Sequence, residues 1–278
     1  MEPWHVAGAL ASALLHASWN AAVKAHARPS DMMTAQMVTS ALLVTPGLLW
    51  TGLPAQAAWP WILASTACSV TAISALLRAY ASCGFGLAYP LTRALGVVFV
   101  VPLATLVSGE VLSGFGLAGI ALIVASLLLL GVTDGRGGAL PARAFGWIAF
   151  GALATAAYVL CDAQGVRHAG SPFAYGFVVS LTNAIALTWL RDPRLNRTRE
   201  IARLIPAALP LAFASVTSFM LILWVWSHGP IAPAAALRDT SAIFAVLIAI
   251  VWLREPFTPA RLLAMLLAAA AVPLLRFA

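Results

Sequence analysis

The sequence predicts an all-α membrane protein in which ten transmembrane helices form two inverted five-helix repeats around a central cavity. Composition is the first reason, because 62% of the 278 residues are apolar and 9% are charged, whereas a soluble domain has about 25% charged residues. The second is a series of apolar runs of bilayer length, and the third is a pattern that occurs twice. Because so few charged residues cannot cover a water-facing surface, the chain is predicted to lie in lipid.

The predicted helices follow one another with short connections. Each run is near the roughly 20 residues that cross a bilayer as a helix, and the runs lack the alternating polar residues of barrel strands. Small turns at Gly84 and at Gly229-Pro230 join the third span to the fourth and the eighth to the ninth. The ten spans are 4–23, 33–51, 59–81, 86–108, 114–132, 144–166, 172–190, 204–226, 231–253 and 259–277.

Basic residues are distributed unequally between the two ends of these spans. Only Arg167 and Arg276 follow even-numbered spans, whereas twelve basic residues follow odd-numbered ones. By the positive-inside rule, this bias places the odd-numbered connections in the cytoplasm and both termini outside. The net charge of +7 is thus explained by orientation and by contact with anionic lipid, and no nucleic-acid partner is expected. The twelve residues are Lys24, Arg28, Arg78, Arg136, Arg143, Arg191, Arg194, Arg197, Arg199, Arg203, Arg254 and Arg261.

The two halves of the chain, residues 1–134 and 143–278, repeat one pattern within one membrane domain. Arg93 and Glu110 match Arg238 and Glu255 at the same separation of 145 residues. Because each half crosses the membrane an odd number of times, the second half must enter from the opposite side. Inverted repeats of this kind place a substrate site near mid-bilayer, where the halves meet.

Arg93 and Arg238 are each about the eighth residue of an apolar span, roughly 10–12 Å from its start. A charge at this depth costs at least ~2.5–3.5 kcal/mol, so it is expected to face an aqueous cavity or a partner. In one interpretation, a carboxylate such as Asp239 or Asp162 neutralises each arginine and only locks helices together. In the interpretation that we favour, the arginines bind the anionic part of a substrate, and Asp239 supplies a negative group for a zwitterion.

Other polar and aromatic residues are candidates for the same cavity. In the first span, residues 16, 19 and 20 share one helical face, although a tryptophan there can equally belong to an interfacial belt. Residue 89 lies about one turn before Arg93, next to a proline that loosens the helix. A serine can donate to a carboxylate or to its own helix backbone with equal ease. The substrate-binding candidates beside the three charged residues are Trp19, Asn20, Tyr89, Tyr158 and Ser241.

Asp162 and His16 are the candidates for proton coupling, although Asp162 could instead be the ion-pair partner of Arg167. The two glutamates of the repeat, Glu110 and Glu255, are expected to be structural, because each precedes a span whose positive helix end it would stabilise. Residues 113 and 258 read as N-caps of those two spans. Both spans are rich in small residues and are expected to be scaffold or a homodimer surface.

Patterns of catalysis and metal binding are not found in the sequence. It contains no GxSxG, HExxH or P-loop pattern, and Cys68, Cys83 and Cys161 are isolated from one another. We therefore expect no enzyme activity, no metal and no cofactor. The lack of an ATP-binding segment also excludes ATP-driven transport by this chain alone.

Several segments together resemble the ten-span bacterial members of the drug/metabolite transporter (DMT) superfamily, in the EamA group. They are LLHASWNAAVK (14–24), RAYASCGFGLAYPLTRAL (78–95), SGEVLSGFGLAGIALIVAS (108–126), AYVLCDAQGVR (157–167) and ALRDTSAIFAVLIAIVWLRE (236–255). The resemblance implies an inner-membrane exporter or exchanger of small metabolites with a central cavity. Relatives include exporters of amino acids, aromatic ones among them, and proteins linked to phosphonate use. It also implies that both termini are cytoplasmic, which is opposite to the arginine count.

The expected function is that of a secondary transporter, located in the bacterial inner membrane, which exports or exchanges small zwitterionic or anionic metabolites by alternating access. Amino acids, including aromatic ones, are the leading substrates, and a phosphonate or another organic anion is the alternative. A channel or a membrane-embedded enzyme is the alternative from another class. The expected partners are the substrate and the lipid bilayer, and the chain is expected to act as a monomer or a homodimer.

Overall fold

The structure, a computed structural model, describes residues 1–83, 85–134, 141–191, 198–252 and 257–278. Within these ranges, ten helical stretches are long and apolar enough to cross a membrane. The chain is therefore a multi-pass helical membrane protein. The helices are α1 (Pro3–Ala25), α2 (Pro29–Thr51), the short 3-10 helix η1 (Gln56–Ala58), α3 (Trp59–Cys83), α4 (Phe85–Ser108), α5 (Gly114–Asp134), α6 (Ala142–His168), α7 (Pro172–Arg191), α8 (Thr198–His228), α9 (Ile231–Asp239), α10 (Ser241–Trp252) and α11 (Pro259–Arg276).

The predicted spans correspond to these helices in order, with bounds that differ by up to four residues and with two larger differences. The span predicted to begin at residue 204 begins at Thr198, because helix formation does not stop where the apolar run does and polar residues extend it beyond the lipid. The span predicted as one helix over 231–253 is divided at Thr240 into α9 and α10. There the Thr240 hydroxyl donates to the Leu237 carbonyl at 2.6 Å, and the Thr240 N–H donates to the same oxygen at 3.2 Å. This local tightening interrupts the helix.

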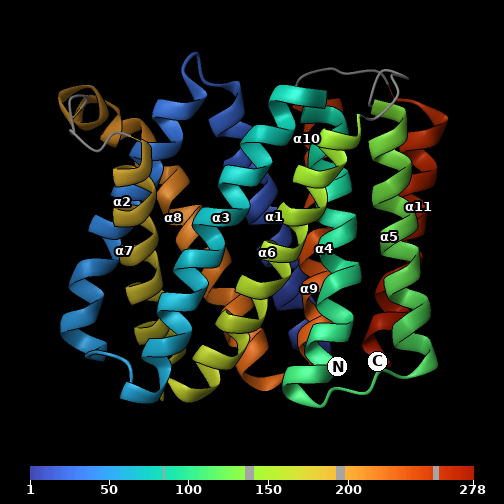
Figure 1. Ribbon diagram of the computed structural model, residues 1–278, viewed down its shortest axis with the longest axis horizontal. Helices are drawn as coiled ribbons and strands as arrows, with labels where there is room; N and C mark the ends of the chain where they lie inside the picture. The colour runs from blue at the N-terminus through green and yellow to red at the C-terminus, as the bar shows by residue number, and fades with distance from the viewer. Residues whose placement is uncertain (84, 135–140, 192–197, 253–256) are drawn as a thin grey trace.

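The helices form a row in which α2 and α7 lie at one edge and α5 and α11 at the other (Figure 1). Between the edges, α4 packs against α6 and α9, and α3 packs against α6. In order along the two halves, α1 corresponds to α6, α3 to α8, and α4 to α9. The α3–α6 contact therefore corresponds to an α8–α1 contact, and the α4–α6 contact to an α9–α1 contact. Both of these are present. The contacts agree with two equivalent halves, and the inversion of one half relative to the other stays a prediction.

Both termini lie on the same side of the molecule, at the lower ends of the helices in Figure 1. The terminal amino group of Met1 donates to the backbone carbonyl of Arg276, so the start of α1 lies beside the end of α11. This placement is what an even number of crossings requires.

Small residues bring the central helices close together, and large apolar residues cover the outside. In α9, Ala234 and Ala236 are fully buried, and Ala152 and Ala163 are fully buried in α6. On the outer surface many large apolar side chains are exposed, for example Leu106, which is 81% exposed. An apolar surface of this extent is what a lipid environment requires. The close central packing positions the charged residues described next.

Candidate functional site

Arg93 and Asp239 form an ion pair between the two halves of the chain. Arg93 Nη1 lies 3.0 Å from Asp239 Oδ1, and the two side chains are only 14% and 11% exposed. Arg93 is carried by α4, and Asp239 is the last residue of α9, where the helix is interrupted. Asp239 therefore neutralises Arg93, as one of the two interpretations of the sequence expected. It does not form such a pair with Arg238.

The other contacts of Arg93 hold its guanidinium in a fixed position. Its Nη2 lies 3.2 Å from His16 Nε2, and because a guanidinium can only donate, this nitrogen of His16 must be the acceptor. The guanidinium carbon lies 5.2 Å from the centre of the Tyr89 ring, which is within the range of a cation–π contact. Arg93 therefore has a carboxylate, an imidazole and an aromatic face as partners.

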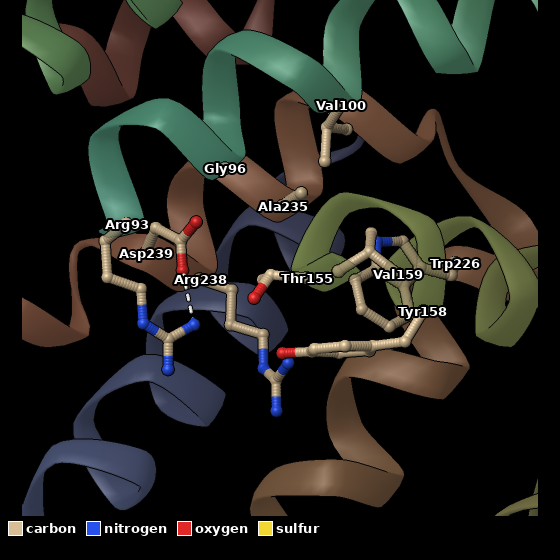
Figure 2. Close-up of a pocket in the computed structure, with 10 residues that line it drawn as sticks. All are labelled: Arg93, Gly96, Val100, Thr155, Tyr158, Val159, Trp226, Ala235, Arg238 and Asp239. Carbon is tan, nitrogen blue, oxygen red and sulfur yellow. Dashed lines mark hydrogen bonds and ion pairs between the residues drawn. The ribbon is translucent and has the colours of Figure 1, made fainter. Parts of the chain in front are cut away.

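Arg238 has a different environment. Its guanidinium carbon lies 5.8 Å from the centre of the Trp226 ring, and its Nε is buried without a hydrogen-bond partner among the described residues. The side chain extends beside Tyr158, toward the hydroxyl end of that ring (Figure 2). Asp239 does not pair with it, in agreement with the divergence expected for adjacent helical positions. Arg238 is thus a half-buried cation whose buried Nε is an unused donor.

Both arginines line the same cavity, which lies between α4, α6, α8 and α9 (Figure 2). The cavity has a volume of about 10 Å³, which is room for roughly one water molecule. An organic solute cannot enter without a movement of the surrounding helices. The lining residues are Arg93, Gly96, Val100, Thr155, Tyr158, Val159, Trp226, Ala235, Arg238 and Asp239.

Four of the predicted site residues line this cavity, namely Arg93, Arg238, Asp239 and Tyr158. The other predicted residues are next to the charged groups or away from them. His16 contacts Arg93, its ring packs edge-on against Trp19 with centroids 5.2 Å apart, and its backbone carbonyl accepts from Asn20 Nδ2. Tyr89 packs against Arg93, and the Ser241 hydroxyl is buried without a hydrogen-bond partner among the described residues.

The lining residues that sequence reasoning missed lie at helical spacing from predicted ones. Thr155 is three residues before Tyr158, Gly96 is three residues after Arg93, and Ala235 is three residues before Arg238. Extending the face of each predicted residue by one turn would therefore have found them. Trp226 gave no such signal, because the apolar part of α8, residues 204–226, contains no charged residue that marks its inward face.

Asp162 does not pair with Arg167. Its Oδ1 accepts from Ser65 Oγ at 2.6 Å and from the Tyr175 hydroxyl at 3.0 Å, and the residue is 2% exposed. Arg167 is one turn further along α6, where it donates to the backbone carbonyls of Trp226 and Gly229. The rotation between the two positions on α6 directs them to different neighbouring helices.

Glu110 caps a helix, but not the helix that follows it in sequence. Its Oε1 accepts from Ile231 N at 2.5 Å and its Oε2 accepts from Ala232 N at 3.2 Å, so it caps α9 in the other half. Arg167 Nη2 lies 3.9 Å from Glu110 Oε1. The carboxylate therefore satisfies two of the open N–H groups at the positive end of α9, and the expectation that it serves α5 is wrong. Glu255 lies outside the described residues.

The predicted N-caps are present. The Ser113 hydroxyl accepts from Gly116 N at 3.1 Å, and the Thr258 hydroxyl accepts from Arg261 N at 3.3 Å. The Ser113 hydroxyl also donates to the Phe277 carbonyl, and this bond links the start of α5 to the end of α11. Within the described ranges, no group of three or more His, Cys, Asp or Glu side chains is placed to hold a metal ion.

The fold and the cavity define the class of protein: a multi-pass helical membrane protein with a small cavity, lined by charged residues, between its two halves. Residues 143–277 match the model of the EamA-like transporter family. The second half of the chain therefore belongs to this family, which carries the signature of the DMT superfamily, and the resemblance seen in the sequence is confirmed. Membership of this family indicates a membrane transporter of the DMT type.

The fold is also found in solved structures. One crystal structure, whose title names only a protein, aligns with a TM-score of 0.71 over 99% of this chain and 96% of that chain. The sequences are 13% identical, so the similarity shows the fold alone. No protein of curated function matches the chain.

Proposed function

We propose that the chain is a secondary transporter of the bacterial inner membrane that exports or exchanges small zwitterionic or anionic metabolites by alternating access. The observation that carries this proposal is Arg238, which lines the small cavity and whose buried Nε has no hydrogen-bond partner in the described part of the chain. A cation held in a membrane interior at this cost is expected to serve a pathway or a ligand.

The leading substrate is an amino acid. A guanidinium can bind a carboxylate through two parallel N–H bonds, and Arg238 retains an unused Nε for this purpose. Asp239, which also lines the cavity, is the group that an ammonium would approach in competition with Arg93. The rings of Tyr158 and Trp226 in the lining favour an aromatic side chain.

A phosphonate or another organic anion is the second candidate. The presence of two guanidinium groups on one cavity favours it, because Arg93 would add a second cation if its pair with Asp239 opened. A doubly charged oxyanion would use both arginines and would leave Asp239 without a role in binding. Whether substrate binding requires the Asp239 carboxylate therefore distinguishes an amino acid from an oxyanion.

Transport requires the helices around the cavity to move, since the present volume holds no metabolite. The halves supply matching helices to the site: α4 from the first and α9 from the second, with α6 and its counterpart α1 beside them. If the halves exchange conformations, one end of the cavity opens as the other closes. This is the motion that inverted repeats support in secondary transporters.

Counterflow in proteoliposomes tests the proposal. Vesicles are loaded with unlabelled L-tryptophan, L-alanine or 2-aminoethylphosphonate, and uptake of the labelled form is followed; we expect transient, saturable accumulation. Neither a channel nor an enzyme produces this overshoot. Arg238→Gln should abolish it, and Arg199→Gln, at an exposed position of α8, is the matched control that should not. Equal counterflow in the Arg238 variant would overturn the binding role.

A further inference from the structure

A second buried carboxylate lies one helical turn from the cavity. Asp162 follows Tyr158 on α6 by four residues, and its side chain enters the contact of α6 with α3 and α7. Ser65 of α3 and Tyr175 of α7 both donate to its Oδ1. One carboxylate oxygen thus joins three helices, at a residue that is 2% exposed.

Among the described residues, no cation forms an ion pair with Asp162. In the part of the chain that the structure describes, no lysine, arginine or histidine nitrogen lies within 4.0 Å of its carboxylate, in contrast to Asp239. A carboxylate in the hydrocarbon region costs several kcal/mol if it is charged and unpaired. Two hydroxyl donors stabilise the charged form in part, and a bound proton removes the cost altogether.

The ionisable groups around Asp162 are few. They are Tyr175 on α7, Cys68 on α3, Cys161 on α6 itself and Arg238 on α9, which is close enough to act on it electrostatically. Arg238 is also the cation of the cavity with unused donor capacity. A change at the cavity that neutralises Arg238 therefore acts on the charge of Asp162.

We propose that Asp162 is a proton-binding site of this transporter and that its protonation is coupled to occupancy of the cavity. This inference rests on the proposed function, and it names the coupling ion. The bond that forms is an O–H on the carboxylate, and the proton comes from water, so no other reactant is consumed. Ser65 and Tyr175 then face a neutral carboxyl, and the junction of α3, α6 and α7 is weakened.

The sign of the coupling follows from the charges. An anion at Arg238 cancels the attraction of that guanidinium for the Asp162 carboxylate, so the carboxylate takes up a proton more readily. Proton and anion therefore bind together, and the loaded protein carries both in whichever direction the gradients favour. His16 is less suited to this role, since its Nε2 already accepts from Arg93 and a proton there would oppose the guanidinium.

Infrared spectroscopy tests the site without any substrate. The purified full chain is titrated with acid, and the carbonyl stretch of protonated carboxyl groups is followed. We expect one buried carboxyl band in the native protein that is lost in Asp162→Asn and shifted in Tyr175→Phe, which keeps the carboxylate but removes a donor. Asp31→Asn, a buried aspartate paired with Arg28 at 3.6 Å, is the control and should leave that band in place.

Proton uptake tests the coupling. Addition of L-tryptophan or 2-aminoethylphosphonate to the native protein in weak buffer should remove protons from the medium, as read by a pH-sensitive dye. Asp162→Asn should abolish this uptake. Uptake that is unchanged in Asp162→Asn, together with an unchanged infrared band, would overturn the inference. Loss of counterflow in the native protein would instead count against the proposed function, and the infrared titration would still decide the status of Asp162.

Discussion

Arg93 of the first half and Asp239 of the second half are joined by an ion pair 3.0 Å long that lies on the wall of the central cavity. The residue adjacent to Asp239, Arg238, lies on the same cavity without such a partner. The matched arginines of the repeat are therefore not equivalent in this conformation. One is held by the protein, and the other is the residue that we propose binds a ligand.

The Arg93–Asp239 pair is expected to contribute to stability. Removal of one partner of a buried pair costs roughly 3–5 kcal/mol, because the other charge is left uncompensated; residual exposure of both side chains places this pair at or below the lower end. Arg93→Gln and Asp239→Asn should each lower the Tm in detergent. The double variant should be more stable than the sum of the single losses indicates. Additive losses in this double-mutant cycle would show that the two side chains do not interact.

Arg238 is expected to govern binding more than stability. A hydrogen bond to a charged group contributes about 1.5–3 kcal/mol, so Arg238→Gln should weaken substrate binding about ten- to a hundredfold with little change in Tm. Arg238→Lys retains the charge but loses the planar pair of donors. Its affinity for substrate should therefore lie between that of the native protein and that of Arg238→Gln. Titration calorimetry with the substrate found by counterflow gives these constants. Full affinity in the lysine variant would show that only charge is needed.

Glu110 is expected to stabilise the start of α9. Loss of a helix cap costs about 0.5–2 kcal/mol, so Glu110→Ala should lower the Tm and should also change transport, because α9 carries Arg238 and Asp239. Thr258→Ala removes an N-cap from α11, which contributes no residue to the cavity lining, and should lower the Tm alone. The comparison therefore separates capping from positioning. Equal effects of the two variants on transport would contradict a special role for Glu110.

Gly165 is expected to tolerate no side chain. A Cβ at this position would lie 2.6 Å from the hydroxyl oxygen of Tyr175, which is itself fully buried. Gly165→Ala should therefore displace Tyr175 from Asp162 and destabilise the protein by roughly 1–3 kcal/mol, as overpacking does. Gly146→Ala, at an open position of the same helix, should be neutral or slightly stabilising. Thermal unfolding of the two variants measures the difference.

Orientation can be decided at the C-terminus. The arginine distribution predicts that both termini are outside. The two termini do lie on the same side of the molecule, at the lower ends of the helices in Figure 1. A reporter active only in the cytoplasm, fused after Ala278, should therefore be inactive, and a reporter active only outside should be active. The reverse result would place the termini inside, as the family resemblance implies.

The sequence was sufficient for the helices and for the charged part of the site, for one physical reason. In lipid, an uninterrupted apolar run and a charge within it are both strong constraints, so the spans and Arg93, Arg238 and Asp239 could be identified. Trp226 could not, because tryptophans are equally at home on a lipid-facing or interfacial surface.

Partner choice also could not be predicted. It depends on the rotation of each helix about its axis, and a rotation of α6 decides that Asp162 meets Ser65 and Tyr175 and not Arg167. In the same way, the dipole argument predicted that Glu110 binds a helix start, but not that this start belongs to the other half. The interruption at Thr240 was missed because a single threonine in an apolar run carries no signal for it.

That interruption makes α9 a lever of nine residues. One end is capped by the carboxylate of Glu110, and the other end, which carries Arg238 and Asp239, meets Thr240, where the regular helix is interrupted before α10 begins. With a rise of about 1.5 Å per residue, a tilt of about 10° around the capped end displaces the far end by about 2 Å. A displacement of this size is enough to separate Asp239 from Arg93, so a modest pivot of one short helix can exchange an internal ion pair for an external ligand.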